Sequence, residues 1–162
     1  MAEPTRILFV CMGNICRSPL AESVFRHLAR QRGVEDRFEL DSAGTSGYHV
    51  GAAPDRRSAA VALGRGVEVA GRSRQLAARD LRRFDYVVAM DADNLAEIEA
   101  LHVASGGTAR GHRLREWDPE GGGLDVPDPY YGGARGFEDV HDMVERSCAA
   151  LLDHLLREQG AA

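Results

Sequence analysis

The residues best suited to catalysis in this chain stand close together near its start. Cys11 and Arg17 belong to the segment Cys-Met-Gly-Asn-Ile-Cys-Arg-Ser-Pro, which ends at Pro19. An ionised cysteine is a nucleophile, and the planar guanidinium of an arginine can hold two phosphate oxygens at once. The pair therefore predicts attack by a thiolate on the phosphorus atom of a phosphate ester.

The elements on either side of this segment make it suitable as an anion site. The apolar run at 6–10 predicts a buried strand, and apolar residues at helical spacing predict a helix at 19–32. A tight turn between them points backbone N–H groups at one place and adds the positive end of the helix dipole. Gly13 and Asn14 tolerate the left-handed backbone that such a turn needs. These surroundings favour the thiolate form of Cys11.

Two roles are open to Ser18 in this loop. Its oxygen could cap the following helix, or its hydroxyl proton could be donated to the sulfur of Cys11, and the sequence leaves both open. A Cys-x5-Arg pattern also arises by chance, with a cysteine at a strand end and Arg17 on the surface. The strand before, the helix after and the Ser-Pro that follows Arg17 argue against coincidence and favour phosphate-ester chemistry.

Strands and helices alternate along the rest of the chain. We expect strands at 6–10, 38–40, 84–90 and 112–114, and helices at 19–32, 54–63, 93–103 and 137–156. This order predicts a three-layer αβα fold of the α/β class, with a central four-stranded parallel sheet and helices on both faces. The phosphate-binding loop follows the first strand, at the end where ligands bind in such sheets. The length suits one domain over residues 1–162.

Composition excludes several classes of function. All 20 basic residues are arginines, so Walker-type nucleotide loops and Schiff-base chemistry, which use lysine, are excluded. A net charge of −5 argues against nucleic acid as a partner. The chain has neither an apolar run of about 20 residues nor a signal-peptide pattern, so we expect a cytoplasmic protein without a membrane partner. Residues 56–83 hold eight arginines and two acidic residues, which form either a docking face for an anionic partner or a solvated surface.

The three cysteines are not expected to form a disulfide framework, because their number is odd and no export signal precedes them. Cys16 could form a redox pair with Cys11, or it could be a small residue that fills the loop. Cys148 falls on the apolar stripe of the helix at 137–156, so we expect it in the core. No cysteine or histidine cluster has zinc spacing. We expect no metal or organic cofactor, because Arg17 and the loop N–H groups take the place of a cation.

Five segments spread along the chain carry a family pattern. They are 11–22, 41–45 with 48–51, 73–75, 84–86 with 90–91, and the Asp-Pro-Tyr-Tyr-Gly at 128–132. On these segments the chain resembles the low-molecular-weight protein tyrosine phosphatases over essentially its whole length. The first and last segments together are highly specific. The arginine-only composition, rich in alanine and glycine, is typical of a bacterial member from a GC-rich genome.

The resemblance implies a protein tyrosine phosphatase that hydrolyses phosphotyrosine, and aryl phosphates, through a phosphocysteine intermediate. Cys11 would be the nucleophile, Arg17 the phosphate clamp and Asp128 the general acid. Asp118 and Asp125 lie nearby in the sequence, and only the resemblance selects Asp128 over them. The expected partners are tyrosine-phosphorylated proteins and a phosphate or other oxyanion in the loop, with the chain a monomer or a weak dimer.

The resemblance also implies how substrate binds. The loop would hold the phosphate, and aromatic side chains would enclose the phenol ring. The matching positions are Met12, Gly13, Asn14, Ile15, Cys16 and Ser18 in the loop, and Tyr48, Tyr130 and Tyr131 around the ring. Family members often carry tryptophan at the first tyrosine position, so Tyr48 is expected to shift the peptide preference.

Three other functions fit parts of the same pattern. Bacterial protein arginine phosphatases resemble this chain but usually carry threonine at the position of Ile15, where a branched apolar side chain would crowd a guanidinium-linked phosphate. An arsenate reductase needs cysteines that relay electrons away from the loop, and only Cys148 remains for that role. A non-catalytic phosphate-binding module would lack the nucleophile, the clamp or the acid, and all three residue types are present here.

Overall fold

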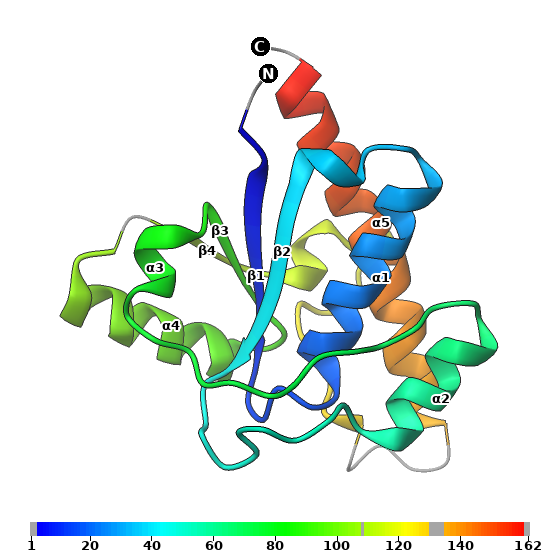
Figure 1. Cartoon of the computed structure of the whole chain (residues 1–162), viewed down its shortest axis with the longest axis horizontal. Coiled ribbons are helices and arrows are strands. Elements are labelled where there is room, and N and C mark those ends of the chain that lie inside the picture. Colours follow the sequence, from blue (N-terminus) through cyan, green and yellow to red (C-terminus); the bar gives the residue numbers. More distant parts are fainter. Residues whose placement is uncertain (1–2, 108, 130–134, 161–162) are drawn as a thin grey trace.

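The computed structural model describes residues 3–107, 109–129 and 135–160, and its elements alternate between strands and helices (Figure 1). In chain order they are β1 (Thr5–Cys11), α1 (Arg17–Gln31), η1 (Glu35–Arg37), β2 (Phe38–Gly44), α2 (Arg56–Gly64), α3 (Asp80–Arg83), β3 (Tyr86–Ala89), α4 (Ala92–Ser105), β4 (Arg110–Arg113), η2 (Leu114–Trp117) and α5 (Gly136–Gly160). The two η elements are short 3₁₀-helices. In this described part of the chain, no helix combines the length and apolarity that crossing a membrane requires.

The four strands form one parallel sheet in the order β2-β1-β3-β4. Helices α1 and α5, with α2 beside them, lie on one face of this sheet, and α3 and α4 lie on the other (Figure 1). The predicted three-layer α/β fold with a four-stranded parallel sheet is therefore confirmed. Because β1 lies between β2 and β3, the loop that follows it opens at the carboxyl end of a central strand.

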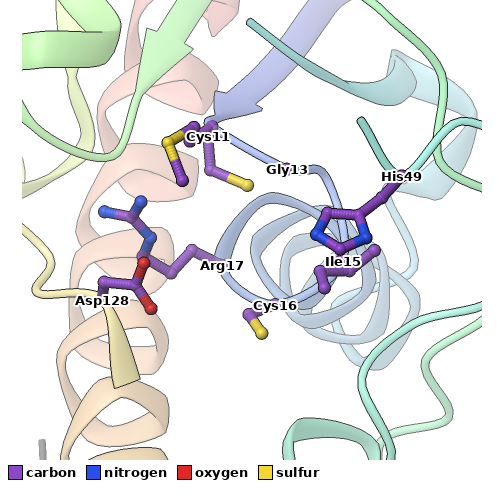
Figure 2. A pocket seen from close by; sticks show the side chains of 8 residues that line it. Cys11, Gly13, Ile15, Cys16, Arg17, His49 and Asp128 are labelled. Atoms are coloured by element: carbon purple, nitrogen blue, oxygen red, sulfur yellow. The ribbon is translucent and has the colours of Figure 1, made fainter. Parts of the chain in front are cut away.

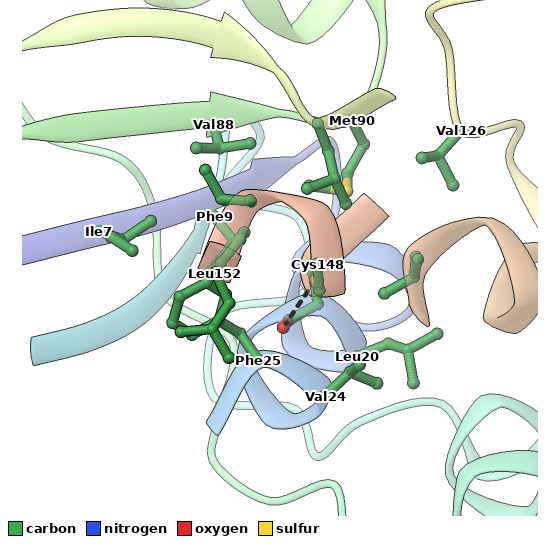
Figure 3. Packing of buried hydrophobic residues seen from close by; sticks show 14 of the residues in the cluster. Ile7, Phe9, Leu20, Val24, Phe25, Val88, Met90, Val126, Cys148 and Leu152 are labelled. Carbon is green, nitrogen blue, oxygen red and sulfur yellow. Dashed lines mark hydrogen bonds between the residues drawn. The ribbon is translucent and has the colours of Figure 1, made fainter. Parts of the chain in front are cut away.

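The side chains of β1 explain why both faces of the sheet are covered. Ile7 and Phe9 are fully buried in the core beneath α1 and α5, and the ring of Phe9 lies 6.0 Å from that of Phe25 (Figure 3). Leu8 and Val10 point the opposite way and pack in a second core beneath α4. Successive strand residues face opposite sides of a sheet, so a continuous apolar run belongs to a strand covered on both faces.

Cys148 lies in the first of these cores, as predicted. Its side chain is fully buried in α5, and its sulfur lies 3.7 Å from the carbonyl oxygen of Ala21 in α1 (Figure 3). Burial raises the pKa of the Cys148 thiol far above its ordinary value, so the group stays protonated. A buried, protonated thiol is a poor relay, which removes the remaining cysteine that an arsenate reductase would need.

Several element boundaries differ from the prediction, and one difference matters for the site. α1 begins at Arg17, two residues before the predicted start at Pro19, so Arg17 and Ser18 belong to its first turn. The preceding residue, Cys16, makes no side-chain cap, and an uncapped start carries no sequence signal. β2 continues to Gly44 because it pairs with β1 along its whole length. Helix α3 was not predicted because its few residues show no helical period.

The arginine-rich stretch at 56–83 is partly neutralised by carboxylates. The ion pairs are Arg57 with Asp55, Arg65 with Asp142, Arg74 with Asp41 and Asp80, and Arg83 with Glu39. The exposed pairs among them contribute little to stability, but all of them reduce the local positive charge. They favour a solvated surface over a docking face for an anionic partner.

Candidate active site

A pocket of about 240 Å³ opens where the loop after β1 meets the first turn of α1 (Figure 2). Its lining residues are Cys11, Met12, Gly13, Ile15, Cys16, Arg17, His49 and Asp128. The three residues expected to do the chemistry, Cys11, Arg17 and Asp128, therefore meet in one hollow. Within the described ranges, no three histidine, cysteine or acidic side chains are grouped as a metal site.

The sulfur of Cys11 is faced by two polar groups, one in the loop and one in the first turn of α1. The backbone N–H of Asn14 donates to Sγ over 3.2 Å, and Ser18 Oγ lies 3.0 Å from it. Asn14 Nδ2 donates to the same hydroxyl oxygen over 2.8 Å. That bond uses the oxygen of Ser18 as acceptor, so its hydroxyl can donate to the sulfur at 3.0 Å, which is closer than the other acceptor, the carbonyl oxygen of Ala43 at 3.5 Å. The alternative role of Ser18 as a helix cap is wrong, because the residue lies inside the first turn of α1.

Asn14 holds the loop in shape from behind the pocket. Its backbone is left-handed, with a φ of 55°, as its residue type predicted. Its side chain is buried, and Oδ1 accepts from the backbone N–H of Arg74 over 3.0 Å while Nδ2 also donates to Ser42 Oγ over 3.0 Å. This side chain does not line the pocket, so any contact of Asn14 with substrate would come from its backbone.

Gly13 serves a different purpose from the predicted one. Its φ is not in the left-handed region, so the prediction that it supplies left-handed backbone is wrong. A Cβ atom at this position would lie 3.0 Å from Cδ2 of His49, which is tighter than ordinary packing. The missing side chain makes room for His49, whose ring forms the wall opposite Arg17 and Asp128 (Figure 2). Sequence reasoning missed His49, because the pattern around Gly13 gives no sign of a distant neighbour.

Of the three tyrosines predicted around the phenol ring, the structure describes Tyr48, which does not line the pocket. Tyr48 is 87% exposed, and its ring packs edge-on against His49 with 4.9 Å between the centroids. Neighbouring residues of a loop project in different directions, so His49 occupies the wall position expected for Tyr48. Tyr130 and Tyr131 lie outside the described residues.

Arg17 is buried, so the interpretation that it is a surface residue is wrong. Its Nη1 donates to Asp91 Oδ2 over 2.6 Å and to the carbonyl oxygen of Val126 over 2.8 Å. Among the described residues, nothing accepts a hydrogen bond from Nε or Nη2 of this guanidinium. These two nitrogens form one edge of the planar group, and such an edge can hold two phosphate oxygens.

The structure separates the three candidate acids. Asp128 lines the pocket, on the side of the guanidinium (Figure 2). Asp118 is buried elsewhere, and although burial alone would raise the pKa of Asp118, hydrogen bonds, above all from Arg146, lower it below its ordinary value. Asp125 accepts from the backbone N–H of Ala92 over 3.0 Å and does not line the pocket. Only Asp128, of these three, is placed to exchange a proton with a ligand there.

The segment that carries Asp128 is anchored two residues earlier. Val126 is fully buried, its N–H donates to the carbonyl oxygen of Met90 over 2.7 Å, and its own carbonyl oxygen accepts from Arg17. Prolines on both sides of Asp128 restrict the backbone further. A short, stiff connection therefore fixes the position of the Asp128 carboxyl relative to the Arg17 guanidinium.

Comparison with known proteins identifies the family. Residues 6–161 match the sequence model of the family described as low molecular weight phosphotyrosine protein phosphatase. The chain belongs to this family. The low molecular weight protein-tyrosine-phosphatase of Streptomyces coelicolor is 45% identical over 156 residues, which cover 95% of this chain and 94% of that protein.

Solved structures of other proteins superpose on this low molecular weight phosphatase over nearly its whole length. The crystal structure of YfkJ from Bacillus subtilis is 37% identical, covers 97% of this chain and 98% of that chain, and has a TM-score of 0.90. The Drosophila arginine phosphatase DARP is 32% identical, covers 92% of this chain and 96% of that chain, and has a TM-score of 0.86. The family resemblance inferred from five sequence segments is therefore confirmed.

Asp91 fixes the orientation of Arg17 in this low molecular weight phosphatase. We expect Asp91→Asn to lower kcat/KM on an aryl phosphate by about tenfold to a hundredfold, the scale seen when a catalytic group is misplaced. One oxygen of Asp91 binds Arg17, while the other caps α4 by accepting from the N–H of Asn94 over 2.8 Å. Asparagine has a single acceptor oxygen, so it cannot keep both bonds. Steady-state kinetics would measure the loss, thermal unfolding would check the fold, and unchanged kinetics would contradict a positioning role.

Cys16 lines the pocket of the phosphatase as a protonated thiol. Burial, followed by the nearby Asp55, Cys11 and Asp128, raises the pKa of Cys16 to about 12, although Arg17 acts in the opposite direction. A thiol with such a pKa carries almost no thiolate at neutral pH, so Cys16 is a poor nucleophile.

Peroxide treatment separates the two sequence-based roles of Cys16. We expect the wild type to regain activity when thiol is added after peroxide, and Cys16→Ser to regain far less. An oxidised Cys11 that finds no partner proceeds to sulfinic acid, which thiols do not reduce. Residual hydrolysis of an aryl phosphate measures the recovery. Equal recovery by the two proteins would show that Cys16 is only a small residue that fills the loop.

Proposed function

We propose that this chain hydrolyses phosphotyrosine in proteins, and other aryl phosphates, through a phosphocysteine intermediate. The observation that carries the proposal is the pocket where the Cys11 sulfur, the Arg17 guanidinium and the Asp128 carboxyl meet. A nucleophile, an anion clamp and a proton donor are the groups that this reaction needs. Membership of the family supports the same reaction and the same substrate class.

In the first step, the thiolate of Cys11 attacks the phosphorus atom in line with the phenol oxygen. A sulfur–phosphorus bond forms, the bond from phosphorus to the phenol oxygen breaks, and Asp128 gives its proton to the departing oxygen. The three other phosphoryl oxygens carry the developing charge, which lies against Arg17 and the loop N–H groups. This step produces phosphocysteine and a free phenol, which in a protein substrate is the hydroxyl of tyrosine.

In the second step, water hydrolyses the phosphocysteine. Asp128, now ionised, takes a proton from the water while the water oxygen attacks phosphorus, and the sulfur–phosphorus bond breaks. Cys11 leaves as a thiolate, which the Ser18 hydroxyl, 3.0 Å away, stabilises by donating a hydrogen bond. Inorganic phosphate then departs, with Asp128 protonated for the next cycle. The partners in this proposal are tyrosine-phosphorylated proteins of the cytoplasm. The chain itself acts as a monomer or a weak dimer.

Matched peptides that carry phosphotyrosine, phosphoserine or phosphoarginine test the proposed substrate class. We expect the highest kcat/KM for phosphotyrosine. Phosphoserine is too short to reach the buried sulfur of Cys11, and Ile15 leaves little room for a phosphorylated guanidinium. A higher kcat/KM for phosphoarginine would overturn this assignment. That outcome is the second candidate function, because DARP, a structural neighbour of this chain, is an arginine phosphatase.

Ile15 provides a direct test of that second candidate. Its side chain lines the pocket next to His49 (Figure 2), where it narrows the space for a bulky phosphorylated group. We expect Ile15→Thr to raise kcat/KM for phosphoarginine relative to phosphotyrosine by about tenfold, the usual effect of a small change in pocket volume. Ile15→Val is the matched control. Valine has the shape of threonine without its hydroxyl, so comparing the two variants separates the effect of side-chain volume from that of the hydroxyl. An unchanged ratio in both variants would show that this position is not the filter.

A further inference from the structure

A second hollow adjoins the proposed active site on the side of α4, and we name it the α4 groove. Its volume is about 710 Å³, and it shares Met12, Arg17 and Asp128 with the first pocket. Its far side is formed by the first turns of α4, including Asn94 and Glu97. The shared lining makes the two hollows continuous, so a peptide whose phosphate enters the first pocket has an adjoining surface to follow in the second.

The α4 groove is strongly acidic. Its carboxylates belong to Asp91, Asp93, Glu97 and Asp128, and its single guanidinium, that of Arg17, already pairs with Asp91. Asp93 and Glu97 are exposed, stand one helical turn apart on α4 and form no ion pair with a described residue. A phosphate dianion is repelled by such acids unless the substrate also carries a positive charge beside them.

A buried amide in the α4 groove points to a ligand with N–H donors. Asn94 lines the groove and is 2% exposed, and among the described residues no donor reaches its Oδ1. A buried acceptor without a partner is uncommon in folded proteins, and a ligand can supply the missing bond. A guanidinium has five N–H donors and can bind carboxylates and an amide oxygen at once, whereas an acidic side chain could bind neither.

We propose that the α4 groove binds an arginine of the substrate protein that lies within a few residues of the phosphotyrosine. This inference rests on the proposed function, because the phosphotyrosine fixes the peptide at the first pocket. Asp93 and Glu97 pair with the guanidinium, and Asn94 accepts one of its N–H groups. The chain therefore selects phosphotyrosine sites with a basic neighbour over sites with an acidic one.

Kinetics on a peptide series test this selection. Each peptide carries one phosphotyrosine in an alanine background, with a single arginine or a single glutamate placed at one of the three positions before or after it. We expect the best arginine peptide to exceed the glutamate peptide of the same position by about threefold to tenfold in kcat/KM, the size of one or two exposed ion pairs. The ratio should fall as ionic strength rises, because salt screens exposed charges.

Two variants of α4 locate the origin of the preference. In the double variant Asp93→Asn, Glu97→Gln, the arginine-to-glutamate ratio should fall to about one, since both exposed carboxylates are gone. Glu99→Gln removes an exposed charge from the same helix outside the groove, so it should leave the ratio and the rate on p-nitrophenyl phosphate unchanged. An arginine preference that persists in the double variant would overturn the assignment to the α4 groove.

The outcomes separate this inference from the function on which it rests. If the wild type hydrolyses all the peptides with the same kcat/KM, the α4 groove does not select arginine, while the phosphatase function stands. If the wild type hydrolyses neither the peptides nor p-nitrophenyl phosphate, the phosphatase function fails, and the selection of arginine fails with it.

Discussion

Replacing Cys11 with serine is expected to lower kcat on an aryl phosphate by at least about 10⁴-fold, the scale of loss when an enzyme is deprived of its nucleophile. A serine hydroxyl ionises far less readily than a thiol, so the loop N–H of Asn14 and the hydroxyl of Ser18 would face a neutral group instead of a thiolate. The attack on phosphorus would then lack its electron pair in reactive form. Steady-state hydrolysis of p-nitrophenyl phosphate measures the loss.

The Cys11→Ser protein should still bind inorganic phosphate, because Arg17 and the loop N–H groups are unchanged. Calorimetric titration with phosphate checks this and shows that the variant is folded. Cys148→Ala is the matched control, since it removes a sulfur from the core under α5, away from the pocket, and should leave kcat within about threefold. Turnover by Cys11→Ser at the wild-type rate would refute the phosphocysteine mechanism.

Asp128→Ala is expected to lower kcat by about 10²–10⁴-fold on a poor leaving group such as the phenol of tyrosine, the usual contribution of general acid catalysis. Nitrophenolate leaves without help from a proton, so the loss on p-nitrophenyl phosphate should be smaller. A series of aryl phosphates with leaving groups of graded acidity measures this difference. In the variant, kcat should depend more steeply on the acidity of the leaving group than in the wild type.

Asp125→Ala is the matched control for Asp128→Ala. Both carboxylates belong to the same segment, but Asp125 binds the N–H of Ala92 and does not line the pocket. Its removal should change kcat about equally for all leaving groups. If the loss grew with poorer leaving groups in Asp125→Ala and not in Asp128→Ala, the general acid would be Asp125, and the assignment to Asp128 would be wrong.

Local features of the site could be predicted because sequence neighbours form them. The strand, the loop and the helix around Cys11 and Arg17 follow from an apolar run, a turn and a helical period within a few residues. The left-handed backbone of Asn14 follows from its residue type. The start of α1 at Arg17 could not be predicted, because no capping side chain marks it. That small error left the role of Ser18 open.

Long-range features of the site were beyond sequence reasoning. Asp91 follows β3 and lies 74 positions from Arg17 in the sequence. No sequence pattern links the two residues, although Asp91 accepts a hydrogen bond from Arg17 in the structure. The place of His49 in the pocket wall could not be predicted, because its ring packs against Gly13, where a side chain would otherwise be. Asp128 was selected by family resemblance, because charge and spacing alone do not separate it from its acidic neighbours. A parallel sheet brings such distant segments together at one edge, and no single segment shows which others will lie beside it.

The position of Cys11 at the end of β1 has a consequence for how the molecule opens. β1 has a paired strand on each side and a packed core on each face, so its amide hydrogens exchange with solvent only in the rarest, most global openings. The segment that bears Asp128 belongs to no strand of the described chain, and its anchors include the backbone bonds of Val126 and the bonds to Asp125. We therefore expect hydrogen exchange to be slower at the floor of the pocket, in β1, than in the segment that bears Asp128, so that the sulfur of Cys11 keeps its place in openings that release this carboxyl.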